Sequence, residues 1–99
     1  MLIYNVTVNI DDDVHEDWLA WMQGEHIPEV MKCSLFESNK MFKVLTDDEG
    51  HTYSIQYRCD SQNKLNRYFE EYAPKLQEEH SNRYKDKFVA FRTILEEVS

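Results

Sequence analysis

His26 is the residue of this sequence best suited to acid–base chemistry. It lies in the stretch 24–31, "GEHIPEVM", directly before Ile27 and Pro28, where an amphipathic helix is expected to end. An unperturbed imidazole titrates near neutral pH, so His26 can accept or donate a proton if it faces a cavity. The alternative is a histidine that hydrogen-bonds a backbone group at the helix junction. Because no orienting partner accompanies His26, the sequence gives this second interpretation slightly more weight.

A second candidate set consists of polar residues expected on neighbouring strands. Asn5, Thr7 and Gln56 are predicted to converge on one face of a sheet. On that face Arg58 or Arg92 could bind a carboxylate or an enolate through its guanidinium group. The alternative, which we favour slightly, is that these side chains form hydrogen bonds and ion pairs between two copies of the chain.

Metal binding has little support in the sequence. His26 and Glu29 are spaced i, i+3, but Pro28 interrupts the helix and no third ligand is nearby. The acidic runs 11–13 and 47–49 lack the spacing of a calcium loop and are expected to be solvated turns. We therefore expect neither a metal nor a cofactor.

The remaining histidines and the two cysteines are predicted to have no role in chemistry. His15 and His51 lie in charged, turn-like segments, and His80 is expected on a solvated helix face or at a helix end. Cys33 and Cys59 do not form a CxxC pair, have no recognisable histidine partner and are interpreted as reduced thiols. A disulfide between them stays open, because the sequence gives no distance.

Four strands are predicted to position these residues. Alternating apolar and polar side chains indicate strands at 2–10 and 52–59, and two further strands, apolar on both parities, are predicted at 35–45 and 88–95. The polar segment 46–52 is typical of a turn, so the second and third strands are expected to form a hairpin.

Two helical regions separate these strands. The first begins at the acidic run 11–13, and Gly24 is expected to weaken or end it before Pro28 starts a second short helix. The other region begins with Asp60-Ser61 as its cap, and Pro74 should kink or split it.

The predicted order, β-α-β-β-α-β, is that of a single ferredoxin-like α+β domain over residues 1–99, with an antiparallel four-stranded sheet and helices on one face. Even residues of 2–10 and odd residues of 52–59 are expected to face the helices. The outer strands are apolar on both faces, so large apolar groups should lie on the open face. We therefore predict a symmetric homodimer through that face, with a solvated monomer as the alternative.

Composition limits the possible partners. The 41% apolar and 13% aromatic content of the 99 residues is typical of one folded domain. The net charge of −8 argues against nucleic acid and against an anionic membrane surface. No apolar run approaches the length of a membrane span, and no signal peptide is recognised. The two cysteines, interpreted as reduced thiols, favour the cytoplasm.

Residues 25–30, "EHIPEV", follow a tryptophan-bearing helix, and this arrangement resembles the dimeric α+β barrel superfamily. Several branches of that superfamily carry a His-x-Pro element after the first helix, here at 26–28. The segments 67–80 and 87–98 resemble a small bacterial family of uncharacterised proteins, a domain of unknown function, within the superfamily. The resemblance therefore implies a fold and a dimer.

The resemblance implies no particular reaction, because the superfamily includes cofactor-free monooxygenases, haem-degrading enzymes, isomerases, sugar mutarotases and proteins without known activity. The haem-degrading branch uses an Asn on the first strand, a Trp and a His. Asn5 and His80 match the first and the last, but Trp18 and Trp21 both lie in the first helix. This departure argues against haem degradation.

Two functions follow from the sequence. The first is a homodimer that binds a small organic ligand in the barrel interior without turnover. The second is a cofactor-independent isomerase or monooxygenase-type enzyme that uses His26 as its acid or base. The sequence leaves open whether the chain is an enzyme, and we favour the first function narrowly because no catalytic pair is visible.

Overall fold

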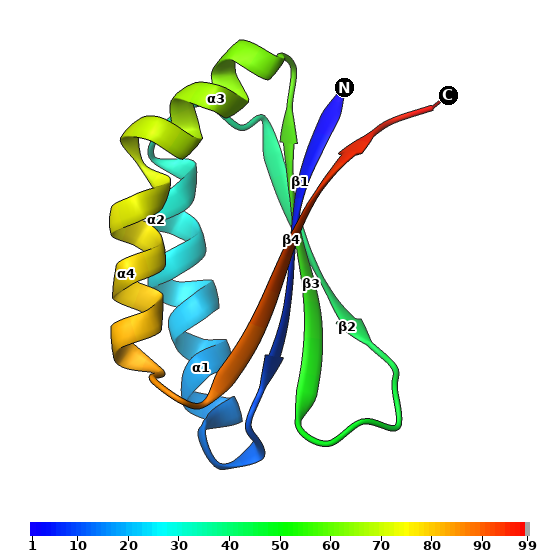
Figure 1. Ribbon diagram of the computed structural model, residues 1–99, viewed down its shortest axis with the longest axis vertical. Helices are drawn as coiled ribbons and strands as arrows, with labels where there is room; N and C mark the ends of the chain where they lie inside the picture. The colour runs from blue at the N-terminus through cyan, green and yellow to red at the C-terminus, as the bar shows by residue number, and fades with distance from the viewer. Residues whose placement is uncertain (99) are drawn as a thin grey trace.

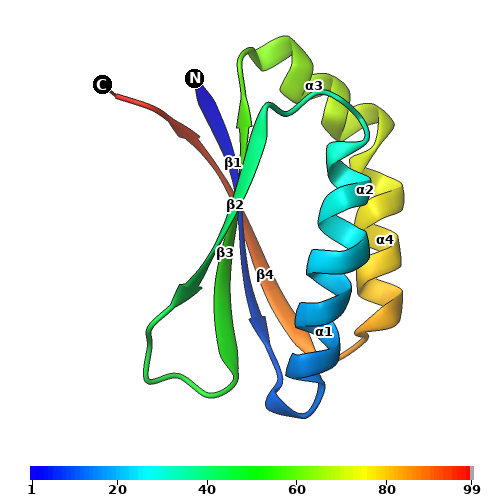
Figure 2. The ribbon, with the colours of Figure 1, turned by 180° about the vertical axis from the view of Figure 1, so that it is seen from behind.

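The computed structural model describes residues 1–98, which form an antiparallel sheet with all helices on one face (Figure 1). The sheet order is β2-β3-β1-β4. The central strands are β1 (Leu2–Ile10) and β3 (His51–Cys59), and the edges are β2 (Ser38–Val44) and β4 (Phe88–Glu96). The other face of the sheet is uncovered in both views (Figures 1 and 2). The predicted α+β, ferredoxin-like architecture is confirmed.

The faces of the two central strands are those that the alternation predicts. Residues directly opposite one another in an antiparallel ladder share a face. Tyr4 lies opposite Tyr57 and Val8 opposite Tyr53, and all four side chains are buried beneath the helices. This burial against the helices is the main source of stability for the sheet.

The register resolves the edge strands, whose sequence is apolar on both faces. Phe42 lies opposite Ser54 and Phe91 opposite Thr7, which places both phenylalanines on the open face with exposures of 46% and 66%. The large exposed apolar side chains of this face are Phe42, Val44, Val89, Phe91 and Leu95. We refer to these five as the open-face apolar group.

The first helical region continues from Asp12 to Met31. Gly24 does not end it but lies in a π-helical turn, and Pro28 lies in the first turn of a second short helix, as predicted. The region comprises η1 (Asp12–Val14), α1 (His15–Trp21), the π-helical η2 (Met22–His26) and α2 (Ile27–Met31). Pro28 lacks the N–H that would bond the carbonyl of Gly24, and a π-helical turn lets the helix continue past that gap. Apolar residues on both sides of η2 are buried against the sheet, which outweighs the weak helix propensity of one glycine.

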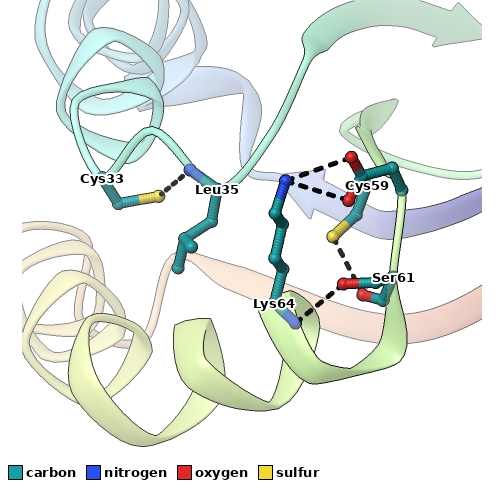
Figure 3. A network of polar contacts seen from close by, with 6 residues as sticks. Cys33, Leu35, Cys59, Ser61 and Lys64 are labelled. Carbon is teal, nitrogen blue, oxygen red and sulfur yellow. Dashed lines mark hydrogen bonds and ion pairs between the residues drawn. The ribbon is translucent and has the colours of Figure 1, made fainter.

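The second helical region is divided at Pro74, as predicted. It consists of α3 (Gln62–Glu71) and α4 (Ala73–Arg83), with Pro74 in the first turn of α4. Ser61 caps α3, because its Oγ accepts a hydrogen bond from the backbone N–H of Lys64 at 3.2 Å (Figure 3). Across residues 1–98, no helix is both long and apolar enough to cross a membrane.

Both cysteines are free thiols, Cys33 in the turn after α2 and Cys59 in β3. Cys59, at the end of β3, donates its S–H to the carbonyl of Ser61 at 3.3 Å (Figure 3). The Sγ of Cys33 accepts a hydrogen bond from the backbone N–H of Leu35 at 3.5 Å (Figure 3). The disulfide that the sequence left open is therefore not formed.

Candidate functional site

A cavity of about 40 Å³ lies between the sheet and the helices. Strands β1, β3 and β4 form one wall, and η2, α2, α3 and α4 contribute to the other. The lining residues that carry polar groups include Tyr4, His26, Tyr68, Gln77, His80 and Arg92. Since a water molecule needs roughly 10–15 Å³ of such volume, the cavity has room for a small polar group. None of the described residues that line it is acidic.

His26 lies on the cavity wall at the end of the π-helical turn. Its ring packs against Trp21 with 4.8 Å between ring centroids. Its Nδ1 is buried and has no hydrogen-bond partner in the described part of the chain. Nearly all buried polar atoms in proteins are paired, so this nitrogen is a candidate for contact with a ligand. A backbone hydrogen bond, the alternative that the sequence suggested, is not formed by Nδ1.

Burial is the main cause that lowers the pKa of His26, to about 4, and the positive charge of Arg92 lowers it further. The imidazole is therefore neutral at neutral pH. A neutral imidazole can act as hydrogen-bond donor or acceptor at Nδ1, depending on the tautomer. His26 is therefore a neutral imidazole on the wall of a cavity, where it can donate or accept a hydrogen bond.

His80 lies beside His26 in the last turn of α4, so it is at a helix end, one of the two predicted positions, whereas the alternative of a solvated helix face was wrong. It is 7% exposed, and its ring centroid is 5.8 Å from that of His26. The Nε1–H of Trp18 donates a hydrogen bond to Nε2 of His80 at 2.9 Å. Burial, followed by the charges of His26 and Arg92, lowers the pKa of His80 to about 4. The site therefore contains two neutral imidazoles.

One signal in the sequence could have identified His80. Leu76 and His80 of α4 and Tyr84, the residue directly after this helix, are spaced i, i+4, i+8, and all three are buried. The acidic residues Glu78 and Glu79 precede His80 and made the segment look solvated.

Arg92 faces the helices, so the prediction that it lies on the open face was wrong. It is opposite Val6 on β1, and the even residues of that strand point to the helices. Its side chain is exposed at the edge strand and also lines the cavity. None of the ion pairs among the described residues includes Arg92. Arg58, in contrast, lies on the open face and pairs with Glu97 at 2.7 Å.

Arg92 also acts on the tyrosines of the cavity. Burial raises the pKa of Tyr4, whereas the charge of Arg92 and hydrogen bonding by Arg92 and Gln77 lower it. Burial likewise raises the pKa of Tyr68, against a smaller lowering by Arg92. Among the lining residues, Arg92 therefore lowers the pKa of Tyr4 and Tyr68 and also that of His26 and His80.

The predicted polar set on the open face is brought together but is bonded internally. The Oγ of Ser54 donates to Oδ1 of Asn5 at 2.6 Å, and Nδ2 of Asn5 donates to Oγ1 of Thr7 at 3.1 Å. Gln56 donates through Nε2 to Oγ of Ser54 at 3.4 Å. These residues lie on the face of the sheet opposite to His26 and Arg92, so the predicted site residues do not form one constellation.

His15 and His51 form a separate pair outside the cavity lining. Their rings stack at 3.6 Å with 9° between planes. The Nε2 of His15 is 2.7 Å from the hydroxyl of Tyr53, and Nε2 of His51 is 2.7 Å from Oδ1 of Asp12. Both are partly buried, so the prediction that they are simply solvated was wrong. Within residues 1–98, no three or more His, Cys, Asp or Glu side chains are grouped to hold a metal ion.

The fold defines the class of protein. It is similar to an EthD family protein of Bacillus halodurans, with a TM-score of 0.70 and 10% identity over 99% of this chain and 100% of that one. It is also similar to SnoaB, a cofactor-independent oxygenase of Streptomyces nogalater, with a TM-score of 0.69 and 8% identity over 99% of this chain and 93% of that one. A dimeric ferredoxin-like protein of an uncultured marine organism has a TM-score of 0.64 and 13% identity, over 100% of this chain and 96% of that one.

The chain therefore shares the ferredoxin-like α+β fold of these proteins. Within that class it belongs to the family described as Domain of unknown function (DUF4286), which matches residues 1–98. No curated protein matches the sequence. At such low identities the structural similarity shows the fold and not the activity.

Proposed function

We propose that the protein binds a small organic molecule in the cavity between its sheet and its helices. The observation that carries this proposal is that His26 lines the cavity while its buried Nδ1 has no hydrogen-bond partner in the described chain. A buried polar atom without a partner costs about 1–3 kcal/mol. A ligand that hydrogen-bonds this nitrogen would remove that cost.

This proposal places the ligand on the helix side of the sheet. It does not place the ligand in the barrel interior, the space that the open sheet faces of two chains would enclose. On the open face, the polar groups of Asn5, Thr7 and Gln56 bond to one another or to Ser54. The cavity, in contrast, combines aromatic walls with His26, whose Nδ1 has no hydrogen-bond partner in the described chain. Ligand sites in proteins commonly have this character, with a mainly apolar lining and a few convergent polar groups.

A cofactor-independent isomerase or oxygenase-type enzyme is the second candidate function. It is supported by His26 and His80, two neutral imidazoles on one cavity. Among the proteins of similar fold, SnoaB is described as a cofactor-independent oxygenase. With a pKa of about 4, His26 is a weak base in the empty cavity. A ligand that develops negative charge beside it would raise that pKa and make proton transfer to His26 more favourable.

We also propose that two chains form a homodimer through the open sheet face. The open-face apolar group exposes two phenylalanines and three aliphatic side chains on one face, a pattern typical of an interface. One protein of similar fold is described as dimeric and ferredoxin-like.

The two free cysteines are consistent with the reducing cytoplasm that the sequence suggested.

A thermal-shift screen of small organic molecules tests the proposed binding. Molecules that bind in the cavity should raise the melting temperature of the wild type and of His51→Ala, whose histidine lies outside the cavity. The same molecules should have little effect on His26→Phe. Equal stabilisation of all three proteins would show that binding does not involve His26 and would contradict the proposal.

Molecules that pass this screen also test the enzyme hypothesis. Each would be incubated with the protein in air without a cofactor and followed by NMR for conversion. Product formation by the wild type and His51→Ala, but not by His26→Phe, would support catalysis. An unchanged spectrum for every bound molecule would favour binding without turnover.

A further inference from the structure

We propose that the cavity binds its ligand as an anion, through a negatively charged oxygen such as that of a carboxylate or an enolate, and that Trp18 is the positioning residue that prepares His80 for it. The proposal rests on the proposed function, because it names the ligand class for the same site. It follows from hydrogen-bond direction and from the distribution of charge around the cavity.

The hydrogen bond from Trp18 fixes the tautomer of His80. An indole N–H can donate a hydrogen bond but cannot accept one. Since Nε1 of Trp18 is 2.9 Å from Nε2 of His80, this imidazole nitrogen must be the acceptor and carries no proton. The proton of the neutral ring therefore lies on Nδ1. Trp18 is fully buried, so the arrangement is fixed by the core of the protein.

His80 thereby becomes a hydrogen-bond donor toward any ligand that reaches it in the cavity. Arg92 adds further donors, because a guanidinium group has five N–H bonds and no acceptor. His26 differs from both, since its unpartnered Nδ1 can donate or accept. The fixed donors of the site therefore require an acceptor on the ligand.

The charge of the cavity favours an acceptor that is negatively charged. The chain has nineteen acidic residues and a net charge of −8. None of the acidic residues within 1–98 lines the cavity, whereas Arg92 lines it and forms no ion pair. With both imidazoles neutral, the lining carries one positive charge, which an anionic oxygen would neutralise.

The size of the cavity is compatible with an anionic head group. A volume of about 40 Å³ exceeds what one water molecule requires and has room for the oxygens of a carboxylate. Arg92 is both part of the lining and exposed to solvent. The remainder of a larger ligand can therefore extend past Arg92 toward solvent while its charged oxygen stays inside.

Titration of the folded protein with matched probes tests the ligand class. Acetate and benzoate would each be compared with the neutral amide of the same shape, acetamide or benzamide, at pH 7.5. Side-chain NMR of ¹⁵N-labelled histidine would report binding at His26 and His80, with His15 and His51 as internal controls outside the cavity. The carboxylates should bind about tenfold more tightly than the amides, the effect expected when a charged acceptor replaces a neutral one.

Arg92→Gln and Arg58→Gln form a matched pair of variants for this titration. Arg92→Gln should remove most of the preference for carboxylate. Arg58→Gln changes the net charge equally but lies on the opposite face of the sheet, so it should retain the preference. An equal effect of both variants would show that the preference arises from general electrostatics and would overturn the proposed role of Arg92.

The nitrogen spectrum of the wild type tests Trp18 without any variant. Protonated and unprotonated ring nitrogens have well-separated ¹⁵N shifts, and His80 should show its proton on Nδ1. Trp18→Phe should shift His80 toward the other tautomer and weaken carboxylate binding, with the folded state checked in the same spectra. A wild-type His80 protonated on Nε2 would overturn the positioning role.

The outcomes separate this inference from the proposed function. If the amides shift His26 and His80 as strongly as the carboxylates do, the site is a ligand cavity but the anionic class is wrong. If no probe moves either histidine, and the thermal-shift screen also finds no molecule that depends on His26, both proposals fail.

Discussion

Replacing His26 and His80 in turn by phenylalanine should change stability in opposite directions. The two substitutions are chemically identical and are made at rings whose centroids are 5.8 Å apart. Each removes two ring nitrogens while retaining an aromatic side chain of similar shape. The expected difference arises because the nitrogens of the two histidines have different hydrogen-bond partners.

His26→Phe should leave stability unchanged or raise it. In the wild type, Nδ1 of His26 is buried without a partner in the described chain. Removing such an atom relieves a penalty of about 1–3 kcal/mol. The larger phenyl ring offsets part of that gain, since overpacking commonly costs about 1 kcal/mol or more. A net gain of about 1 kcal/mol would raise the melting temperature by roughly 4–8 °C in a domain of this size.

His80→Phe should lower stability. It removes the acceptor of the Trp18 N–H, which then remains unpaired in the core. An unpaired buried donor costs about 1–3 kcal/mol, so the melting temperature should fall. His80→Gln is the control, because its side-chain carbonyl can accept the hydrogen bond from Trp18 and should restore part of the loss.

Urea unfolding followed by tryptophan fluorescence, at one fixed protein concentration, measures both effects as free energies of unfolding. The structure predicts that His26→Phe is at least about 1 kcal/mol more stable than His80→Phe. Equal destabilisation by the two variants would refute the reasoning, since it would mean that Nδ1 of His26 has a partner in solution that contributes to the fold.

Three further predictions concern acid, the open face and the cap of α3. Burial lowers the pKa of His26 and of His80 from 6.5 to about 4, so between these pH values the unfolded state binds more protons than the folded state. The free energy of unfolding should therefore fall by about 3 kcal/mol per histidine between pH 6.5 and pH 4. Urea unfolding at a series of pH values would measure this fall, which should be less steep in His26→Phe. Phe91→Glu places a charge in the open-face apolar group. Light scattering should then show a monomer in place of the dimer, while the circular dichroism spectrum stays that of the folded protein. If the variant keeps the mass of a dimeric wild type, the interface lies elsewhere. Ser61→Ala removes the hydrogen bond to the N–H of Lys64 and should lower the free energy of unfolding by about 1 kcal/mol, whereas an unchanged value would mean that the cap contributes nothing.

The sequence predicts the fold well where one parity of a strand is apolar. In β1 and β3 the apolar parity faces the helices, because only one arrangement buries Tyr4, Val8 and Ile55 together. In β4 both parities are apolar, so the alternation gives no direction for Arg92. Its orientation is fixed only by the pairing with Val6, a contact between residues far apart in the chain.

The helical errors have a similar cause. Gly24 and Pro28 favour a break in the helix, but burial of the flanking apolar residues keeps the chain helical through a π turn. His80 is preceded by two glutamates, and its burial depends on how α4 packs against Trp18 in the first helical region. The candidate His26 was identified from its chemistry, but its neighbours His80 and Arg92 come from elements whose packing only the structure reveals.

A crystal structure of the protein with its most stabilising molecule from the thermal-shift screen would test the central claim most directly. The account predicts that the molecule lies between the sheet and the helices, within hydrogen-bond distance of Nδ1 of His26 and with a negatively charged oxygen near Arg92. A molecule bound on the open face, against Asn5 and Gln56, with the cavity left without it, would contradict the account.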